Sequence, residues 1–295
     1  MADYIYECDL HLHTTASDGG WSPEEVVGMA AGRGVMVIAV TDHDTTASVE
    51  RAVVAGRERG VEVIPGVELT TTEGNHMLGY YIRSGQGELE KYLAALRQRS
   101  LAHMRQVVSE MRSTLGLQLS ADELESRTGG GIPNMSHLLD LLHHTGRLPS
   151  PRFDSPEAIE FFGDTDYLVS YYRKFAATKP FTDTAGAIRM IREAGGVAVW
   201  AHPLHNRPPD SGYVGLLKAM GLAGLEVVSP KHDSSAREAL MDICRQYNLL
   251  HTGGTDYHGR YFESIEQGRE IGSCGVDRAI AERLRKSAEA LRRTG

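Results

Sequence analysis

The fold class is decided by the stretch Val35-Met36-Val37-Ile38-Ala39-Val40-Thr41-Asp42-His43-Asp44. Its apolar half is a continuous run, which is typical of a strand buried on both faces of a parallel sheet. A helix is predicted before it, because Ser22-Pro23-Glu24-Glu25 forms a capping box with proline at the first helical position and Gly34 follows the last turn. A second helix, Ala47–Arg59, comes after the strand and ends at Gly60.

Two further strands are predicted, one before the first of these helices in the sequence and one after the second. Tyr4–Leu10 precedes the first helix, and Val61–Val67 follows the second. Alternation of strand and helix in this way implies parallel strands joined by right-handed crossovers. A short strand, His76–Tyr81, comes next. Residues 1–84 therefore predict the first half of an α/β sheet.

The alternation stops at about residue 85 and does not resume before residue 180. No strand is predicted in this stretch. A long helix, Leu89–Leu115, is followed by a capping box at Ser120-Ala121-Asp122-Glu123 and by helices at Asn134–Thr145 and Thr165–Phe175. Residues 85–179 are therefore predicted to form a helical insertion that contributes to the substrate cleft.

Strand and helix alternate again in residues 180–295, the second part of the same sheet. The helix Thr184–Ala194 closes at a Gly-Gly pair, and a terminal helix covers about Asp277–Arg293. The other elements predicted here are strands at Val197–Trp200, Gly224–Val228 and Leu249–Thr252, and a helix at Ser235–Tyr247. About seven strands are expected in all, split by the insertion.

Composition limits the classes of function. The chain has 295 residues, a net charge of −8 and 41% hydrophobic residues, with no apolar run long enough to cross a bilayer. The N-terminus lacks the pattern of a signal peptide, and the cysteines are few and scattered, so a cytoplasmic protein is predicted. The acidic balance disfavours stable binding of long nucleic acid. A small phosphorylated substrate remains compatible with it, because bound metal ions supply local positive charge.

Histidines and acids gather where the predicted strands end, which is where barrels and open α/β folds build active sites. The first strand runs into His11-Leu12-His13, and side chains two residues apart on extended backbone point the same way. Asp18 follows in a glycine-rich turn. The remaining candidates also stand at or near strand ends, and the full set is His11, His13, Asp18, His43, Glu68, His76, His202, Asp256 and His258.

Each of these side chains also has a simpler interpretation. A single histidine is more often structural than a ligand, Asp42 and Asp44 could cap the following helix, and His258 could be a loop residue beside Gly259. The recurrence of six histidines and three acids at strand ends favours a metal site over these separate explanations. Structural roles are predicted for the histidines of helices and strand interiors, namely His137, His143, His144 and His251.

The mixture of imidazole and carboxylate, without a thiolate, suits an open catalytic site for Mn²⁺, with Zn²⁺ or Fe²⁺ as alternatives. The set is larger than one ion needs. A carboxylate such as Glu68 can bridge two ions, and paired ions are a common device for phosphoryl hydrolysis. Two or three divalent metal ions are therefore predicted.

The chain resembles the PHP family (polymerase and histidinol phosphatase) of the amidohydrolase superfamily. The resemblance covers both barrel halves and rests on Asp9-Leu10-His11-Leu12-His13, Thr41-Asp42-His43, Pro65-Gly66-Val67-Glu68, Ala201-His202-Pro203 and Thr255-Asp256-Tyr257-His258. It implies a distorted (β/α)7 TIM-like barrel, made here of residues 1–84 and 180–295, with up to three metals.

The resemblance also implies roles for the candidate residues. His11, His13, Glu68 and Asp256 would hold the first metal, Glu68, His76 and His202 the second, and Asp18, His43 and His258 the third. A hydroxide bridging the first two metals would be the nucleophile, so Glu68, Asp256 and His202 are the implied catalytic residues. His232 is a candidate general acid, with a metal-bound water as the alternative.

Within the family the chain looks like the small phosphoesterases, some of which act on nucleoside 3′,5′-bisphosphates. Two features favour this subgroup, namely the helical insertion and the run Arg192–Pro203. The expected reaction is hydrolysis of the 3′-phosphate, for example of adenosine 3′,5′-bisphosphate to AMP and phosphate. The alternatives are a 5′–3′ exoribonuclease on short RNA, a histidinol-phosphate phosphatase, and a non-enzymatic metal-sensing or interaction module. The complete ligand set argues against the last of these.

A bisphosphate needs a second anion site besides the metals, and basic side chains near the barrel mouth are its natural donors. Lys231 and His232 follow a predicted strand and are expected to face the cleft. The candidates for substrate binding are Lys231, Arg207, His205, Arg99, Arg97, His103 and Arg260. For the arginines of the long helix, the alternative is a solvated, ion-paired surface. The insertion also departs from relatives at Pro133-Asn134-Met135-Ser136-His137, where an Arg-Pro-His stretch is common, so its part in substrate contact stays open.

Overall fold

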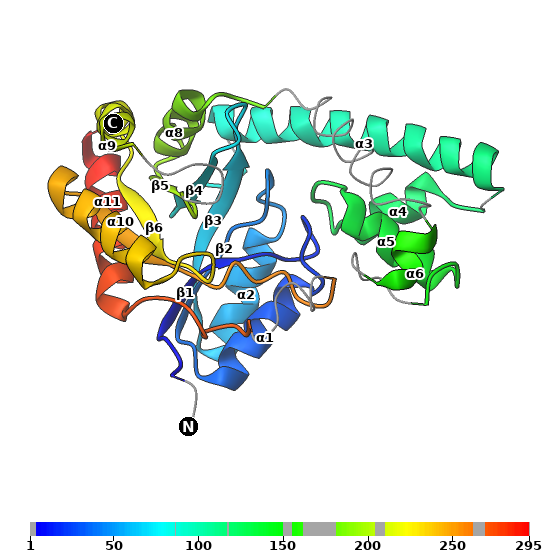
Figure 1. Cartoon of the computed structure of the whole chain (residues 1–295), viewed down its shortest axis with the longest axis horizontal. Helices are drawn as coiled ribbons and strands as arrows, with labels where there is room; N and C mark the ends of the chain where they lie inside the picture. Colours follow the sequence, from blue (N-terminus) through cyan, green and yellow to red (C-terminus); the bar gives the residue numbers. More distant parts are fainter. Residues whose placement is uncertain are drawn as a thin grey trace.

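A computed structural model of the protein describes residues 4–85, 87–116, 118–149, 155–161, 181–203, 210–261 and 269–294. Its strands form one sheet in chain order, and Figure 1 shows them at the centre of the molecule. They are β1 (Cys8–Leu12), β2 (Val37–Val40), β3 (Glu62–Thr70), β4 (His76–Tyr80), β5 (Val197–Trp200), β6 (Gly224–Val228) and β7 (Leu250–Gly253).

Strands β1 to β3 are parallel to one another, and so are β5 to β7, whereas β4 runs antiparallel to both of its neighbours. The chain after β7 returns to the first strand through bridges between Leu12 and Tyr257 and between Cys8 and Val276. The sheet is therefore a nearly closed seven-stranded barrel, and the expected distorted barrel of the α/β class is confirmed.

Two groups of helices surround this sheet. Figure 1 shows the helices of the barrel on its outside, and those of the insertion together on one side of the molecule. The first group is α1 (Pro23–Arg33), α2 (Val49–Arg59), α8 (Thr184–Glu193), α9 (Ser211–Met220), α10 (Ser234–Tyr247) and α11 (Arg278–Thr294). The second group is α3 (Gly87–Leu115), α4 (Ala121–Arg127), α5 (Met135–His144) and α6 (Pro156–Phe161).

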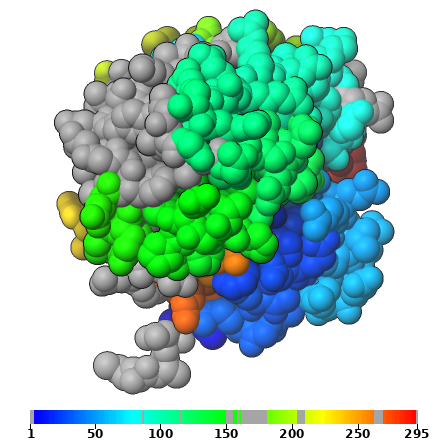
Figure 2. Space-filling view, turned by 90° about the vertical axis from the view of Figure 1, so that its right-hand side faces the viewer, coloured from blue at the N-terminus to red at the C-terminus, as the bar shows by residue number. Residues whose placement is uncertain are grey.

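The insertion has an apolar cluster of its own. Side chains of α3, α4 and α5 pack together around Met104, Leu124 and Leu139, while separate clusters fill the space between the barrel strands and their helices. Burial of a leucine-sized side chain contributes about 1.5–3 kcal/mol, so these helices hold one another together by their apolar faces. Figure 2 shows the insertion, in teal and green, lying against the blue N-terminal part of the chain.

Helix ends agree with the sequence prediction because they depend on local signals. Ser22 and Glu25 form the predicted capping box, and Gly34 and Gly60 end α1 and α2 in the left-handed conformation. Two helices were not predicted. Helix α9 contains Gly212 and Gly215, which weaken a helical pattern, and Gly215 accommodates the ring of Tyr247. Helix α6 is only 6 residues long.

Other boundaries differ from the prediction. Strand β1 begins at Cys8 rather than Tyr4 and continues to Leu12, because pairing with β2 begins at Cys8 and Tyr4 is 67% exposed. The predicted helix Thr165–Phe175 lies outside the described residues. Among the helices that the structure describes, none is long and apolar enough to span a membrane.

Candidate metal centre

The nine candidate ligands converge at one end of the barrel. His11 lies in β1 and Glu68 lies near the end of β3, and the other residues contributed by parallel strands stand beyond the carboxyl ends of those strands. His76 opens β4 and reaches the same end, because this strand is antiparallel to β3. A bridge between His43 and Glu68 extends the pairing of β2 with β3 and brings these two ligands side by side.

Glu68 is the centre of the cluster and is fully buried. Its Oε2 lies 3.0 Å from His11 Nε2 and 3.3 Å from both His13 Nε2 and His43 Nδ1. Its Oε1 lies 2.9 Å from His76 Nδ1 and 3.2 Å from His202 Nε2. One carboxylate therefore faces five imidazoles, with each oxygen turned to a different set of rings, which is the arrangement that a carboxylate bridging two cations requires.

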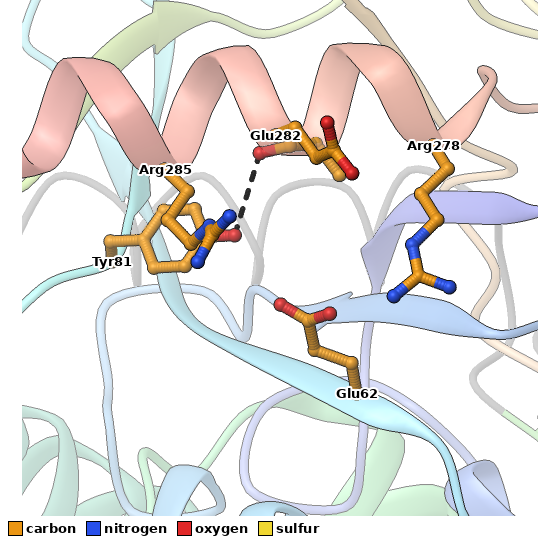
Figure 3. Close-up of a pocket in the computed structure, with 6 residues that line it drawn as sticks. Glu62, Tyr81, Arg278, Glu282 and Arg285 are labelled. Carbon is orange, nitrogen blue, oxygen red and sulfur yellow. Dashed lines mark hydrogen bonds between the residues drawn. The ribbon is translucent and has the colours of Figure 1, made fainter.

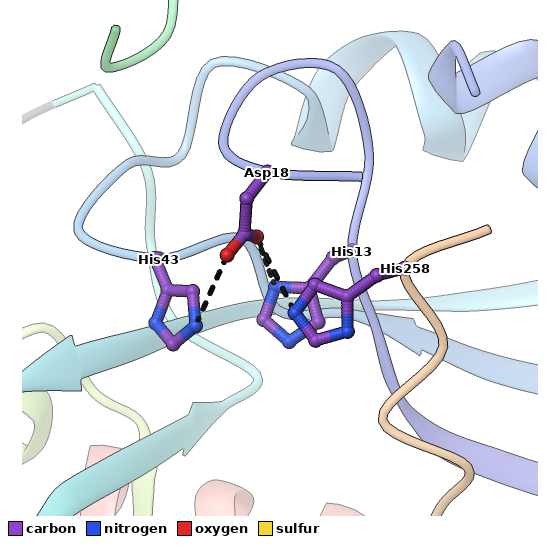
Figure 4. Close-up of side chains that lie close together, drawn as sticks. All are labelled: His13, Asp18, His43 and His258. Atoms are coloured by element: carbon purple, nitrogen blue, oxygen red, sulfur yellow. Dashed lines mark ion pairs between the residues drawn. The ribbon is translucent and has the colours of Figure 1, made fainter. Parts of the chain in front are cut away.

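Asp256 and Asp18 extend the cluster on either side. Asp256 Oδ1 lies 3.1 Å from His13 Nε2 and 3.3 Å from His11 Nε2. Asp18 Oδ1 lies 3.5 Å from His258 Nε2 and 3.6 Å from His13 Nδ1. Figure 4 shows Asp18 pointing from its loop toward His13, His43 and His258. Each acid thus faces several imidazoles, so the cluster offers more than one place for a cation.

Three overlapping groups of donor atoms result, and within each group the atoms lie within 4.8 Å of one another. The partition differs from the one that the resemblance implies, because His202 joins the first set and His13 joins the third. Glu68 and His43 are shared between groups. The groups are His11, Glu68, His202 and Asp256, then His43, Glu68 and His76, and finally His13, Asp18, His43 and His258.

The donor chemistry of the site fits divalent cations. Nitrogen and carboxylate oxygen are the only donor types in the three groups, as hard to borderline metals prefer. His13 Nδ1 and His43 Nδ1 are buried and have no hydrogen-bond partner, although such groups normally find one. Both nitrogens face carboxylates, so a cation placed between them would satisfy atoms that the protein alone leaves unsatisfied.

The electrostatics of the cluster are those of a site built around positive charge. Burial alone would lower the pKa of His11, but the surrounding carboxylates, Glu226 first among them, raise it well above its usual range. Burial alone would raise the pKa of Glu68, but the surrounding imidazoles, His43 first among them, hold it well below its usual range. Protons and metal ions compete for such groups, so metal binding is expected to release protons here.

Backbone strain accompanies two of the candidate ligands. His202 has a φ of 27° and Asp256 has a φ of 52°, and positive φ is rare for residues other than glycine. Such conformations cost on the order of 1–3 kcal/mol and persist where the surroundings hold them. The backbone N–H of His202 donates to Glu226 Oε2 at 2.8 Å, which holds the first of these strained residues in place.

Glu226 is the residue of the site that sequence reasoning missed. It lies inside β6, is fully buried, and places Oε1 2.9 Å from His11 Nδ1. The carboxylate accepts the Nδ1 proton of His11, so that once Nε2 loses its proton to a metal, the Nε2 lone pair is the one directed at Glu68 and Asp256. Its signal in the sequence is an acid within the apolar run Gly224-Leu225-Glu226-Val227-Val228.

We expect the Glu226→Ala variant to bind Mn²⁺ about 10–100-fold more weakly, because His11 loses the partner that fixes its ring and His202 loses its backbone acceptor. Titration of the metal-free protein with Mn²⁺ measures the change. Glu62→Ala is the matched control, since Glu62 is exposed at the start of β3, at the other end of the barrel. Unchanged Mn²⁺ affinity in a folded Glu226→Ala protein would contradict this role.

The candidates for substrate binding are placed as follows. Lys231 Nζ lies 2.6 Å from Asp256 Oδ2, at the metal cluster itself. His232 is buried, its Nδ1 lies 2.9 Å from the carbonyl of Val227, and its Nε2 has no hydrogen-bond partner. Because the carbonyl can only accept, Nδ1 carries a proton, so Nε2 is the nitrogen that can exchange a proton with a bound ligand. His205 and Arg207 lie outside the described residues.

The candidates on α3 and after β7 make contacts within the protein. Arg97 donates to the carbonyls of Gly130 and Gly131 and pairs with Glu125, and Arg99 is exposed on the same helix. The two remaining candidates do not take part in the contacts of Arg97. His103 on α3 is half-buried, and Arg260 stacks on the rings of Trp21 and Tyr261.

A cavity of about 130 Å³ lies at the opposite end of the barrel. Figure 3 shows its lining, in which Arg278 of α11 points toward Glu62, and Arg285 lies beside Tyr81, with Glu282 on the same helix. The charges are balanced, and the lining has no histidine or cysteine. The cluster around Glu68, rather than this cavity, therefore has the groups that hydrolytic chemistry needs.

The protein is similar to several bacterial phosphoesterases along most of its length. The PHP domain family matches residues 9–201. A 5′–3′ exoribonuclease of Haemophilus influenzae is 30% identical over 258 residues, which are 85% of this chain and 89% of that protein. A phosphoribosyl 1,2-cyclic phosphate 1,2-diphosphodiesterase of Eggerthella lenta is 29% identical, over 86% and 94% of the two chains. A 3′,5′-nucleoside bisphosphate phosphatase of Chromobacterium violaceum is 27% identical, over 90% of each.

A solved structure has the same fold. A protein from Bifidobacterium adolescentis, solved as a candidate metal-dependent phosphoesterase, superposes with a TM-score of 0.76 at 25% identity, covering 95% of this chain and 96% of that one. Together with the cluster of histidines and carboxylates, these matches define a metal-dependent phosphoesterase. Because the family match extends over more than half of the chain, the protein belongs to the PHP domain family, and the resemblance inferred from its motifs is confirmed.

Proposed function

We propose that the protein hydrolyses the 3′-phosphate of nucleoside 3′,5′-bisphosphates with the help of two or three divalent cations, Mn²⁺ first among them. The observation that carries this proposal is the fully buried Glu68 between five imidazoles, which provides adjoining cation sites at the barrel mouth. When bound, such cations lower the pKa of a water molecule and neutralise charge on phosphate oxygens. The bisphosphate phosphatase of Chromobacterium violaceum supports the choice of substrate.

The protein's own side chains supply the remaining functions in this proposal. Glu68, Asp256 and His202 are proposed to hold the cations of the reaction, with the other cluster residues completing the sites. Lys231 adds a cationic donor beside Asp256, suited to a phosphate oxygen. His232 is the proposed general acid, and the helices of residues 85–179 are proposed to form part of the substrate cleft.

A second candidate function is 5′–3′ exoribonuclease activity on short RNA, which the relative from Haemophilus influenzae favours. The two reactions share their chemistry. In both, the bond between phosphorus and the 3′-oxygen of a 5′-phosphorylated nucleoside breaks, and a 5′-nucleotide is released. They differ only in whether the phosphorus also bears a second nucleoside. The deciding property is therefore the room beyond the scissile phosphate, and not the metal cluster.

We expect the metal-free protein to be inactive and Mn²⁺ to restore release of phosphate from adenosine 3′,5′-bisphosphate, because the cluster needs cations to neutralise phosphate oxygens. The assay compares AMP release from this substrate with AMP release from a 5′-phosphorylated adenosine dinucleotide, and phosphate release from histidinol phosphate, at equal concentrations. A higher kcat/KM for the bisphosphate supports the first function, and a higher value for the dinucleotide supports the second. Failure to turn over any phosphate ester with Mn²⁺, Zn²⁺ or Fe²⁺ present would refute the proposal.

The cysteines support a proposed cytoplasmic location. Cys8, Cys244 and Cys274 are all free and buried. Burial raises the pKa of the Cys8 and Cys274 thiols to about 12, which keeps them protonated and unreactive. A chain with free thiols of this kind needs no oxidising compartment.

A further inference from the structure

The loop that carries Asp18 is held by the barrel on one side. Asp42, which follows β2 and is fully buried, accepts hydrogen bonds from the backbone N–H of Thr14 at 2.7 Å and from its hydroxyl at 2.8 Å. It also accepts from the hydroxyl of Ser17 at 2.6 Å. The carboxylate of Asp42 therefore acts as an anchor for the loop rather than as the cap of the helix that follows it.

The helical insertion holds the same loop on the other side. His137 of α5 places Nε2 2.9 Å from the carbonyl oxygen of Thr15, and the backbone N–H of Ile132 donates to the carbonyl of Ala16 at 2.8 Å. Contact is close, since a Cβ added to Gly131 would lie 2.0 Å from the carbonyl oxygen of Ala16. Two consecutive carbonyls of the loop thus take their donors from the insertion.

His137 links this contact to the start of its own helix. Its Nδ1 accepts the backbone N–H of Asn134, the residue that caps α5, at 3.1 Å. Because that N–H must donate, Nδ1 is unprotonated, so the proton lies on Nε2 and is donated to Thr15. Burial lowers the pKa of His137, in keeping with a neutral ring in this single tautomer. One side chain therefore both caps the helix and holds the loop through a hydrogen bond.

We propose that His137 is a positioning residue for the cation site formed by His13, Asp18, His43 and His258, so that the insertion controls the occupancy of this site without contributing a ligand. The inference rests on the proposed function, since it assumes that the site binds a cation. Asp18 lies 3.5–3.8 Å from three imidazoles, and a shift of its loop would change all three distances together. The other two groups lack Asp18, and their ligands lie in or just after the strands β1, β2, β3, β4, β5 and β7.

Two substitutions of His137 separate its cap of α5 from its hydrogen bond to the carbonyl of Thr15. His137→Asn keeps an acceptor near the position of Nδ1, and so the cap, but is too short to donate to Thr15. His137→Gln keeps both functions, because its amide places an acceptor and a donor much as the two ring nitrogens do. Gly131→Ala tests the same contact from the backbone side by pushing the loop away. His143→Asn is the matched control, because His143 of the same helix bonds to the carbonyl of Leu148 instead of the loop.

Mn²⁺ titration of the metal-free protein, followed by the electron paramagnetic resonance signal of free Mn²⁺, measures each binding step. The step lost in Asp18→Asn identifies the site in question. We expect the dissociation constant of that step to rise about 10–100-fold in His137→Asn and Gly131→Ala, and to stay within about threefold in His137→Gln and His143→Asn. The other steps and the melting temperature of His137→Asn should stay near those of the wild-type protein.

Three outcomes are informative. Loss of the Asp18-dependent step in His137→Asn, with rescue in His137→Gln, supports the inference. A folded His137→Asn protein in which that step is unchanged overturns it, while leaving phosphate release, measured separately, as evidence for the proposed function. Equal weakening of all binding steps also overturns it, because that pattern belongs to general destabilisation.

Discussion

The Glu68→Gln variant is expected to release phosphate at least about a thousandfold more slowly than the wild-type protein. Glu68 is within 3.3 Å of five imidazoles and belongs to two of the three donor groups. A neutral amide cannot bridge two cations, so one substitution weakens two sites. Cations contribute several kcal/mol to stabilising the transition state of hydrolysis, and about 4 kcal/mol corresponds to about a thousandfold in rate.

The measurement is kcat on the preferred phosphate ester at saturating Mn²⁺, together with the metal content of the purified variant. Glu282→Gln is the control, because it is the same substitution of a carboxylate by an amide, made at the opposite end of the barrel (Figure 3). Both variants should have melting temperatures close to the wild type when excess Mn²⁺ is absent. A Glu68→Gln protein that keeps more than a tenth of the activity would show that Glu68 does not bridge the catalytic cations.

Much of the fold could be predicted from local sequence because local signals set it. The capping box at Ser22 and the glycines after α1 and α2 act within a few residues, and the strand β5 is short, wholly apolar and preceded by glycine. Where local pattern and environment disagree, the prediction was wrong. The aromatic residues from Tyr4 onward suggest a strand, but they lack a pairing strand and Tyr4 is exposed.

In the candidate site, too, some features could be predicted from local sequence and others could not. Histidines and acids at strand ends could be collected from the sequence, because the carboxyl ends of parallel strands meet at one end of a barrel. Their mutual distances could not. Glu226 contacts His11 across 215 residues, and His137 contacts Thr15 across 122 residues. A single acid in an apolar strand, or a histidine in a helix, gives no local indication of such a partner, so both became visible only in the folded chain.

Lys231→Met is expected to lower kcat/KM by about 10²–10³-fold while Mn²⁺ binding is retained. Lys231 Nζ lies 2.6 Å from Asp256 Oδ2. Burial alone would lower the pKa of this lysine, but Asp256 raises it, so the ammonium stays charged. A cation held by Asp256 would repel the ammonium and free it to bond an oxygen of the substrate phosphate. Loss of one preorganised donor to developing charge costs about 10²–10³-fold in rate.

The prediction is specific because Mn²⁺ binding and turnover are expected to change in different directions. If Lys231 competes with the cation for Asp256, its removal leaves Mn²⁺ affinity equal or higher, while turnover falls. Mn²⁺ titration and steady-state kinetics on the same preparation measure both quantities, with Lys218→Met as control, because Lys218 is exposed on α9 and its Nζ lies 3.5 Å from the carbonyl of Asn248. If kcat/KM fell only in proportion to lost Mn²⁺, Lys231 would be a support for the metal site and not a donor to the phosphate.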